Sequence, residues 1–110
     1  MEPTVEFFWW SGCPSWERAL AMLRAEMAAA GLPEAELRLT EIETDAEAAR
    51  NGFPGSPTIR VGGEDIQAPD PVQAIGLTCR VYRRRDGRVS PLPDPEDLKE
   101  ALAAVRSSHE

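Results

Sequence analysis

The alternation of apolar and polar positions predicts a strand followed at once by a helix near the start of the chain. Residues 5–10 read Val-Glu-Phe-Phe-Trp-Trp, with apolar side chains on both faces, which is typical of a central strand covered by helices. Residues 14–30 carry apolar side chains at the spacing of one helical face. Members of this stripe are Trp16, Ala19, Leu20, Leu23, Met27 and Ala30. Gly31 and Pro33 predict the end of the helix.

A second strand and a short helix are predicted next. Residues 36–43 form a strand pattern in which the alternation slips between Leu39 and Ile42, so we expect either a bulge or a partly exposed edge. Residues 44–49 have the pattern of a short helix, and Gly52 would end it.

The second half of the chain favours two hairpins and a closing helix. Residues 58–61 predict a strand, Gly62-Gly63 a tight turn, and Ile66 the start of the return strand. Residues 68–77 have no period and indicate a loop, whereas residues 78–83 predict another strand. A further turn, Asp86-Gly87, then leads to Val89, and a last helix would follow Asp94 as its cap, with Pro95 at its first position. Leu98, Ala101, Leu102 and Val105 give that helix its apolar face.

The order of these elements predicts an α/β fold. A parallel strand–helix–strand unit followed by an antiparallel hairpin gives a mixed sheet of four to five strands with helices on both faces. We expect residues 1–110 to form a single domain, with a site beyond the carboxyl end of the first strand.

Composition is that of an ordinary globular protein. A hydrophobic fraction of 42% and a charged fraction of 28% suit a chain that buries a core without disulfides or metal. Two cysteines are too few for a secreted disulfide scaffold, and neither a signal sequence nor a membrane-spanning run is evident. We therefore expect a cytoplasmic protein whose thiols are kept reduced.

The net charge of −7 argues against nucleic-acid binding, which requires a positive field. A local exception is a group of five arginines, namely Arg80, Arg83, Arg84, Arg85 and Arg88. We interpret it as a solvated hairpin that balances the acidic remainder. An anion-binding patch or a surface for an acidic partner is the alternative.

Cys13 is the strongest candidate for chemistry. It lies where the first strand ends and the helix begins, with Pro14 suited to the first helical position. Cys13 would then be the N-cap, and the N–H groups of Ser15 and Trp16 would point at its sulfur. The positive end of a helix favours thiolate over thiol, so the pattern predicts a reactive cysteine. The alternative is a small buried apolar residue that happens to precede a helix.

Cys79 is the second candidate, either as a buried strand residue or as a partner for Cys13. No general base is evident, because the sole histidine, His109, lies in the tail. Two cysteines without nearby histidines cannot close a tetrahedral zinc site. We interpret Trp16 as a core residue and Gly62-Gly63 as a turn rather than a phosphate-binding loop.

Together these residues resemble a known family. A strand ending in Gly12-Cys13-Pro14, an immediate helix, and Ser56-Pro57-Thr58 before an antiparallel strand are similar to the thioredoxin/glutaredoxin fold. Within that superfamily, residues 12–16 and 76–82 resemble the small bacterial "DF family (seleno)protein" group. The resemblance implies that Cys13 is the nucleophile, that Pro57 is a cis-proline beside it, and that Pro14, Ser15, Trp16, Ser56 and Pro57 contact substrate. Pattern alone favours an ordinary trans proline at position 57.

The resemblance implies a thiol-dependent oxidoreductase that needs no cofactor and acts on thiols or disulfides of proteins or glutathione. Dithiol members of the superfamily place a second cysteine where this chain has Trp16. Cys13 would therefore act as a monothiol through mixed disulfides, or Cys79 would resolve it.

Two other functions remain open. Cys13 and a later Cys-x-Val-Tyr strand are similar to the two-cysteine layout of alkylmercury lyase, which implies soft-metal or organomercurial chemistry. That enzyme needs an aspartate where this chain has Trp16, so binding without cleavage is favoured. The other function is an interaction module without turnover, in contact through the arginine hairpin or the aromatic surface near Trp10 and Trp16.

Overall fold

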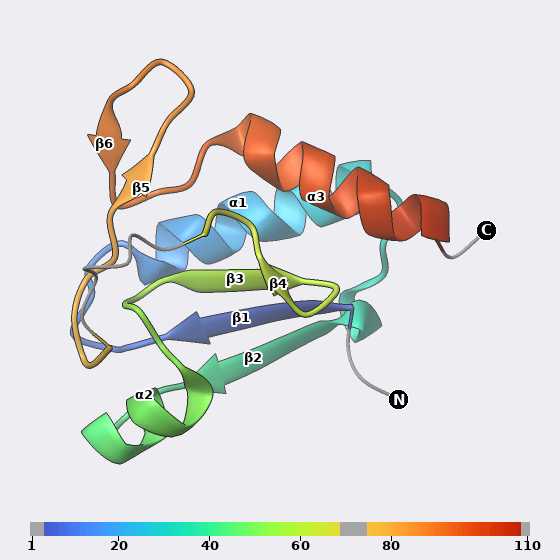
Figure 1. Ribbon diagram of the computed structural model, residues 1–110. Coiled ribbons are helices and arrows are strands. Elements are labelled where there is room, and N and C mark those ends of the chain that lie inside the picture. Colours follow the sequence, from blue (N-terminus) through green and yellow to red (C-terminus); the bar gives the residue numbers. More distant parts are fainter. Residues whose placement is uncertain (1–3, 69–74, 109–110) are drawn as a thin grey trace.

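A four-stranded mixed sheet forms the centre of the fold in the computed structural model, which describes residues 4–68 and 75–108 (Figure 1). In spatial order its strands are β2 (Leu37–Glu41), β1 (Val5–Trp9), β3 (Thr58–Val61) and β4 (Glu64–Asp65). β1 pairs in parallel with β2 and antiparallel with β3, and β3 pairs antiparallel with β4. The predicted α/β fold with a mixed sheet is confirmed.

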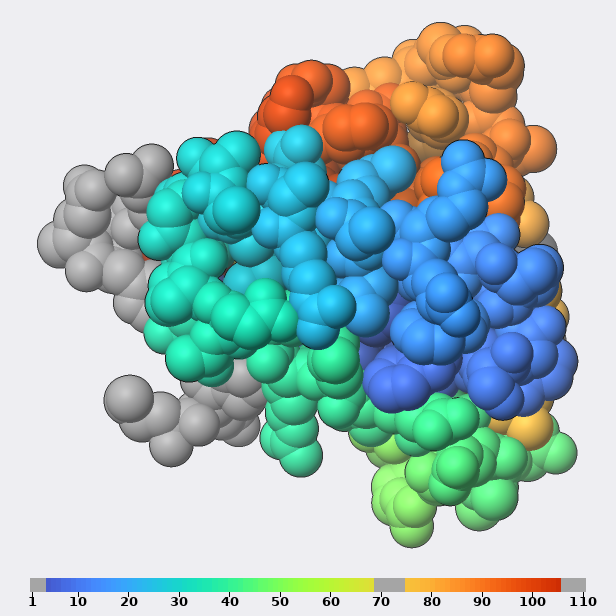
Figure 2. Space-filling model, turned by 180° about the vertical axis from the view of Figure 1, so that it is seen from behind, coloured from blue at the N-terminus to red at the C-terminus, as the bar shows by residue number. Residues whose placement is uncertain are grey.

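Helices cover both faces of this sheet because apolar side chains of β1 alternate between them. Val5 and Phe7 belong to the main core, packed against α1 (Trp16–Ala29) and α3 (Pro95–Ser108). Phe8 points the opposite way and packs with Ala48 of α2 (Asp45–Asn51). Seen from behind, α1 spreads across its face of the molecule with α3 beside it (Figure 2).

The edge strand β2 resolves the two alternatives left open for its broken alternation. The pairing of β1 with β2 runs from Val5 and Leu37 to Trp9 and Glu41 without a slipped residue. Leu39 is 41% exposed. The interruption therefore marks a partly exposed edge and not a bulge. Just before β2, a short 3₁₀ turn, η1 (Glu34–Glu36), leads into the strand.

Capping residues set the ends of α2 and α3 as predicted. The Thr44 hydroxyl accepts the Glu47 N–H at 3.1 Å, and Gly52 ends α2 with φ at 58°. Asp94 accepts the N–H of Glu96 on Oδ1 at 2.9 Å at the start of α3. These local signals act within one helical turn, so the sequence predicts them well.

The predicted hairpins form, but with shifted or shortened strands. The Gly62-Gly63 turn is so tight that Glu64 and Asp65 already pair with β3, so the return strand precedes Ile66. Of the strand expected at residues 78–83, only β5 (Tyr82–Arg83) is regular, and it pairs with β6 (Val89–Ser90) in a separate two-stranded hairpin. The expected loop at 68–77 lies partly outside the described residues.

Within residues 4–68 and 75–108, none of the helices combines the length and apolar character needed to span a bilayer.

Candidate two-cysteine site

The two cysteines of the chain lie 3.9 Å apart although 66 positions separate them in the sequence. Cys13 is in the loop after β1, and Cys79 is in the extended segment that leads to β5. Both are free thiols. The sequence singled out each cysteine, and the fold brings the pair together.

Main-chain contacts of Ser56 connect the segments that carry the two cysteines. Ser56 forms a parallel bridge with Cys79, in which its N–H donates to the Thr78 carbonyl and its carbonyl accepts the Arg80 N–H, both at 2.8 Å. The Cys13 S–H donates to the same Ser56 carbonyl at 3.4 Å. The main chain of one residue therefore holds the backbone on both sides of Cys79 and also contacts the Cys13 sulfur.

The close approach of these segments requires a glycine. Gly55 has φ at +131°, and a Cβ atom there would lie 3.0 Å from backbone atoms of Arg80. The Ser56–Pro57 peptide bond, one residue further on, is cis, as the family resemblance implied and the residue pattern did not. Ser56 is fully buried and its hydroxyl accepts the Trp10 N–H at 3.0 Å. Ser56 and Pro57 are thus internal supports of the site, with no side chain open to solvent.

The expectation that Cys13 caps the first helix is wrong. α1 begins at Trp16, Ser15 is its N-cap, and no side chain makes a capping hydrogen bond there. The reason is a tight turn before the helix, in which the Cys13 N–H donates to the Trp10 carbonyl at 3.0 Å. This turn directs the Cys13 side chain inward, where it is 1% exposed and contacts Ser56.

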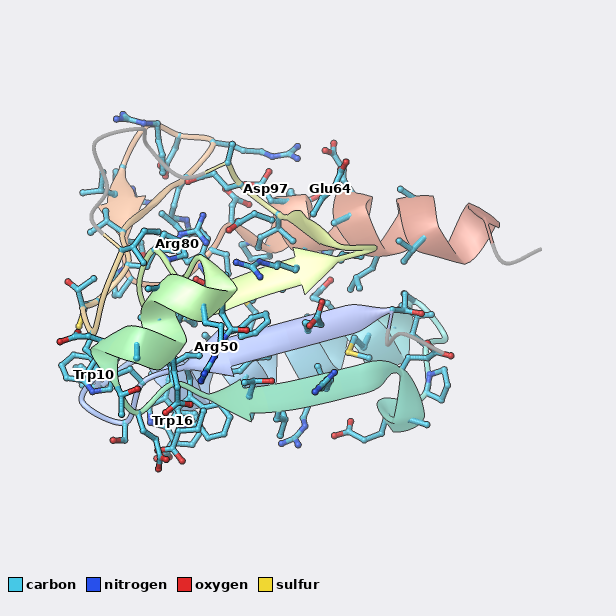
Figure 3. All side chains as sticks on the ribbon, turned by 60° about the horizontal axis from the view of Figure 1, so that its bottom comes forward. Trp10, Trp16, Arg50, Glu64, Arg80 and Asp97 are labelled. Carbon is cyan, nitrogen blue, oxygen red and sulfur yellow. The ribbon has the colours of Figure 1, made fainter. Side chains whose placement is uncertain are left out.

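The residues around that turn separate into exposed and half-buried positions. Pro14 is exposed, whereas Ser15 and Trp16 are half-buried. Trp16 stacks on Trp9 with ring centroids 5.1 Å apart, and it packs against the main core as predicted. Figure 3 shows Trp10 and Trp16 at the same end of the molecule.

The two sulfurs influence each other electrostatically. Partial desolvation raises the pKa of Cys79, and both a negative charge on Cys13 and a hydrogen bond to it raise that pKa further. Two thiolates are therefore disfavoured at this separation. The pair is suited to holding one negative charge at most, or to sharing a covalent bond.

A buried polar network next to Cys79 was missed by the sequence analysis. Arg80 is 2% exposed and binds both carboxylate oxygens of Asp65, at 2.6 and 2.8 Å. Its guanidinium lies 4.4 Å from the ring centroid of Tyr82, and it also donates to the Gln67 carbonyl. The Tyr82 hydroxyl donates to the Pro57 carbonyl at 2.6 Å. This network fixes the inward side of the Cys79 segment.

The interpretation of the arginines as one solvated group is thus wrong for Arg80. An arginine beside apolar positions gives no sequence signal of burial, because its burial depends on a carboxylate 15 positions away. Other members of the group do balance acidic side chains at the surface. Arg85 pairs with Asp97 and Glu100, and Arg88 pairs with Asp86.

Metal ligation by a larger donor set finds no support in the described part of the chain. No three side chains of His, Cys, Asp or Glu gather there in a way that could hold a metal ion. His109 lies outside the described residues. The pair of thiols is the donor set that remains.

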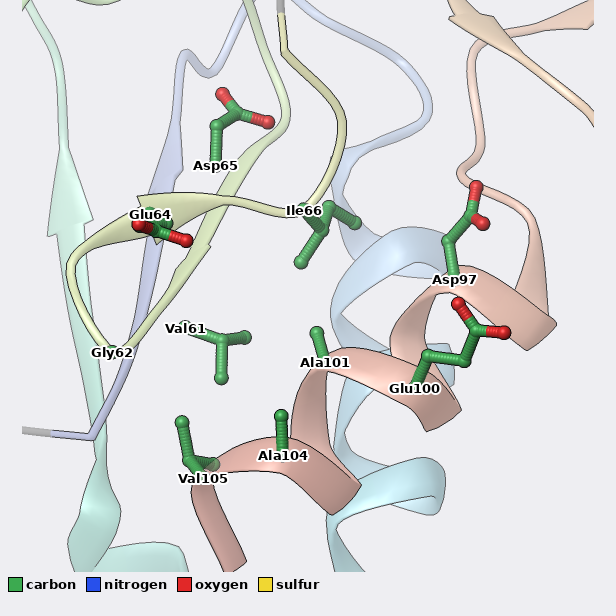
Figure 4. Close-up of a pocket in the computed structure, with 10 residues that line it drawn as sticks. All are labelled: Val61, Gly62, Glu64, Asp65, Ile66, Asp97, Glu100, Ala101, Ala104 and Val105. Carbon is green, nitrogen blue, oxygen red and sulfur yellow. The ribbon is translucent and has the colours of Figure 1, made fainter. Parts of the chain in front are cut away.

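A hollow of about 430 Å³ lies between the β3–β4 hairpin and α3, and neither cysteine lines it (Figure 4). Its wall includes the apolar side chains of Val61 and Ile66, with the acidic Asp65, Asp97 and Glu100 nearby. Each of these three carboxylates is already paired with a buried or surface arginine. Glu64 also lines the hollow and adds a fourth carboxylate to its wall.

No family model, curated protein or solved structure matches the chain.

Proposed function

We propose that this protein is a thiol–disulfide oxidoreductase in which Cys13 and Cys79 cycle between a dithiol and an intramolecular disulfide. The observation that carries the proposal is the 3.9 Å separation of two free cysteines held by separate segments. A disulfide requires the two sulfurs to approach to about 2.05 Å, and rotation of the two side chains would close the bond from this proximity. Ser56 bonds the backbone on both sides of Cys79, which keeps the pair in register while the side chains move.

The cycle balances with a disulfide substrate as oxidant. The first protein thiol loses its proton to water and attacks the substrate disulfide, which releases one substrate thiolate that takes up a proton. The second protein thiol, after losing its own proton, attacks the resulting mixed disulfide and releases the second substrate thiol. The protein ends as a disulfide, and two electrons have passed to the substrate. External thiols, such as those of the cytoplasm, would restore the dithiol.

We also propose that the fold is thioredoxin-like. The support is topological: a β1–α1–β2 unit with parallel strands is followed by the antiparallel strands β3 and β4 and a closing helix. The site then lies at the carboxyl end of β1, where open α/β sheets commonly keep their ligands. Trp16 occupies the position three residues after Cys13 where a second cysteine would be needed for a dithiol pair within one helical turn. Cys79 is therefore the second cysteine of the proposed pair.

Incubation of the reduced protein with glutathione disulfide tests this proposal. We expect both thiols to disappear, the mass to fall by that of two hydrogens, and a peptide linking Cys13 to Cys79 to appear after digestion. The matched controls are Cys13→Ser and Cys79→Ser, each of which would stop at a mixed disulfide or remain reduced. A wild-type protein that keeps both thiols, or that accumulates only glutathione adducts, would contradict the cycle.

The same sulfur pair favours one second candidate, in which a soft cation binds both sulfurs and its positive charge offsets the repulsion between the two thiolates. Mercury(II) titrated into the reduced wild type would then bind with a stoichiometry of one per chain and block both thiols. Loss of either cysteine would weaken that binding. Equal affinity in the wild type and in Cys79→Ser would remove this candidate and leave the redox cycle.

A further inference from the structure

We infer that Cys79 receives the substrate sulfur and that the buried Cys13 resolves the mixed disulfide. This inference rests on the proposed redox cycle and reverses the roles that the family resemblance implies. Its basis is the difference in access between the two sulfurs. Cys13 is 1% exposed, whereas Cys79 is an exposed residue.

Access decides which thiol an external disulfide meets first. Exchange requires the attacking sulfur to approach the substrate disulfide directly, and burial blocks that approach. The Cys13 side chain is turned inward by the loop after β1 and its S–H donates to the Ser56 carbonyl. In this arrangement Cys13 can reach Cys79 but not a disulfide in solvent.

The segment around Cys79 presents that residue outward. Its neighbours alternate, since Arg80 and Tyr82 are buried while Cys79 and Val81 are exposed, Val81 to 55%. Arg80 and Tyr82 are anchored by Asp65 and by the Pro57 carbonyl. Cys79 therefore lies on a fixed backbone with an apolar side chain beside it on the solvent side.

Electrostatics slow the first step, because burial and a negative charge on Cys13 both raise the pKa of Cys79, but they do not oppose the second step. The raised pKa of Cys79 keeps most of it protonated at neutral pH, so its attack would accelerate as the pH rises. Once Cys79 is in a mixed disulfide it can carry no charge, and the repulsion between the two sulfurs is gone. A negative charge on Cys13 then faces a neutral disulfide 3.9 Å away, which favours resolution.

The bonds balance as follows. The Cys79 S–H gives its proton to water, and the thiolate attacks one sulfur of an organic disulfide to form a Cys79–substrate bond with release of a substrate thiol. The Cys13 S–H then loses its proton, and its sulfur attacks the Cys79 sulfur. A Cys13–Cys79 bond forms, the Cys79–substrate bond breaks, and the second substrate thiol leaves with a proton.

The experiment traps the first adduct in single-cysteine variants. Cys13→Ser and Cys79→Ser are each incubated with glutathione disulfide, and the added mass is followed with time. We expect Cys13→Ser, which keeps Cys79, to gain glutathione about tenfold faster or more than Cys79→Ser. Equal rates, or a faster adduct on Cys13, overturn the inferred order.

A wild-type measurement covers the case in which a variant fails to fold. Brief treatment of the reduced native protein with N-ethylmaleimide, followed by peptide mapping, should label Cys79 before Cys13. Preferential labelling of Cys13 overturns the order. Failure of the proposed redox cycle gives a distinct result from failure of the inferred order. If the cycle fails, the oxidised wild type lacks the Cys13–Cys79 bond, whichever cysteine is labelled first.

Discussion

Ser56 sets the distance between the two sulfurs through its main chain. Its carbonyl accepts hydrogen bonds from the Arg80 N–H and the Cys13 S–H, and its N–H bonds the segment just before Cys79. Its hydroxyl serves a different purpose, since it accepts the Trp10 N–H at the start of the Cys13 loop. A buried serine thus joins three stretches of chain, and the geometry of the site depends on where its peptide group lies.

A substitution at Tyr82 tests how much the buried polar network next to Cys79 contributes to stability. Its hydroxyl donates to the Pro57 carbonyl, so Tyr82→Phe should cost about 1 kcal/mol of unfolding free energy at neutral pH. Burial raises the pKa of Tyr82 above its ordinary value of 10. The unfolded chain therefore releases this proton at a lower pH than the folded protein does, and the stability that depends on it is lost as the pH rises above 10.

Denaturant unfolding of the wild type and of Tyr82→Phe across the alkaline range measures this effect. The difference in unfolding free energy between the wild type and Tyr82→Phe should become smaller above pH 10. The wild type loses stability there as its phenol ionises, whereas the variant has no phenol to ionise. Tyr82 is the sole tyrosine, so phenolate absorbance reports its titration directly. Parallel pH profiles would show that the phenol is not protected by the fold.

The individual candidate residues were predictable, but their arrangement was not. Both cysteines stood out because they are the only thiols in the chain, and the position of Cys13 between a strand and a helix was correct. Its direction was wrong, because the turn closed by the Trp10 carbonyl has no strong residue signature. The approach of Cys79 to Cys13 depends on contacts across 66 positions, which no local pattern encodes.

At the scale of elements, local sequence signals predict most of the helices and turns, whereas the remaining structure depends on pairing between segments that are distant in the sequence. The helices and the Gly62-Gly63 turn follow from capping, periodicity and glycine, each of which acts over a few residues. The segment before β5 has the composition of a strand but forms only a single bridge with Ser56 outside β5. Its conformation is set by the buried Arg80, whose partner lies in another element.

The ion pair between Arg80 and Asp65 connects β4 to the Cys79 segment. Asp65→Ala would leave a guanidinium that is 2% exposed without its counter-charge, so we expect a loss of about 3–5 kcal/mol in unfolding free energy. We also expect slower formation of the Cys13–Cys79 disulfide, because Arg80 directly follows Cys79. Urea denaturation and the rate of thiol loss measure the two effects.

Asp86→Ala is the matched control for that variant. It removes an aspartate that also binds an arginine, Arg88, but both side chains are exposed to solvent. Asp86 also accepts the Arg88 backbone N–H at 3.0 Å in the hairpin turn, so we expect at most a small fall in the denaturation midpoint and no change in the rate of disulfide formation. Equal losses in the two variants would mean that burial of Arg80 contributes nothing to the site.

On the scale of the whole molecule, sheet topology explains why two distant loops meet. β1 runs antiparallel to β3, so the loop that follows β1 and the segment that precedes β3 lie at the same end of the sheet (Figure 1). The first carries Cys13 and the second carries Ser56. The chain then returns to this end after β4 and adds Cys79 beside Ser56. The site is therefore a product of strand order, which makes it sensitive to global folding.

The proposed disulfide should accordingly stabilise the whole domain. Closing a loop between positions 13 and 79 restricts the unfolded chain, and the chain-entropy account predicts about 4 kcal/mol of added unfolding free energy. Denaturant unfolding of the wild type, oxidised with glutathione disulfide or reduced with excess dithiol, measures this difference. Cys79→Ser given the same treatments is the control and should unfold alike in both. An oxidised wild type that is equally or less stable would mean that forming the bond strains the native arrangement of Ser56 and the two cysteine segments.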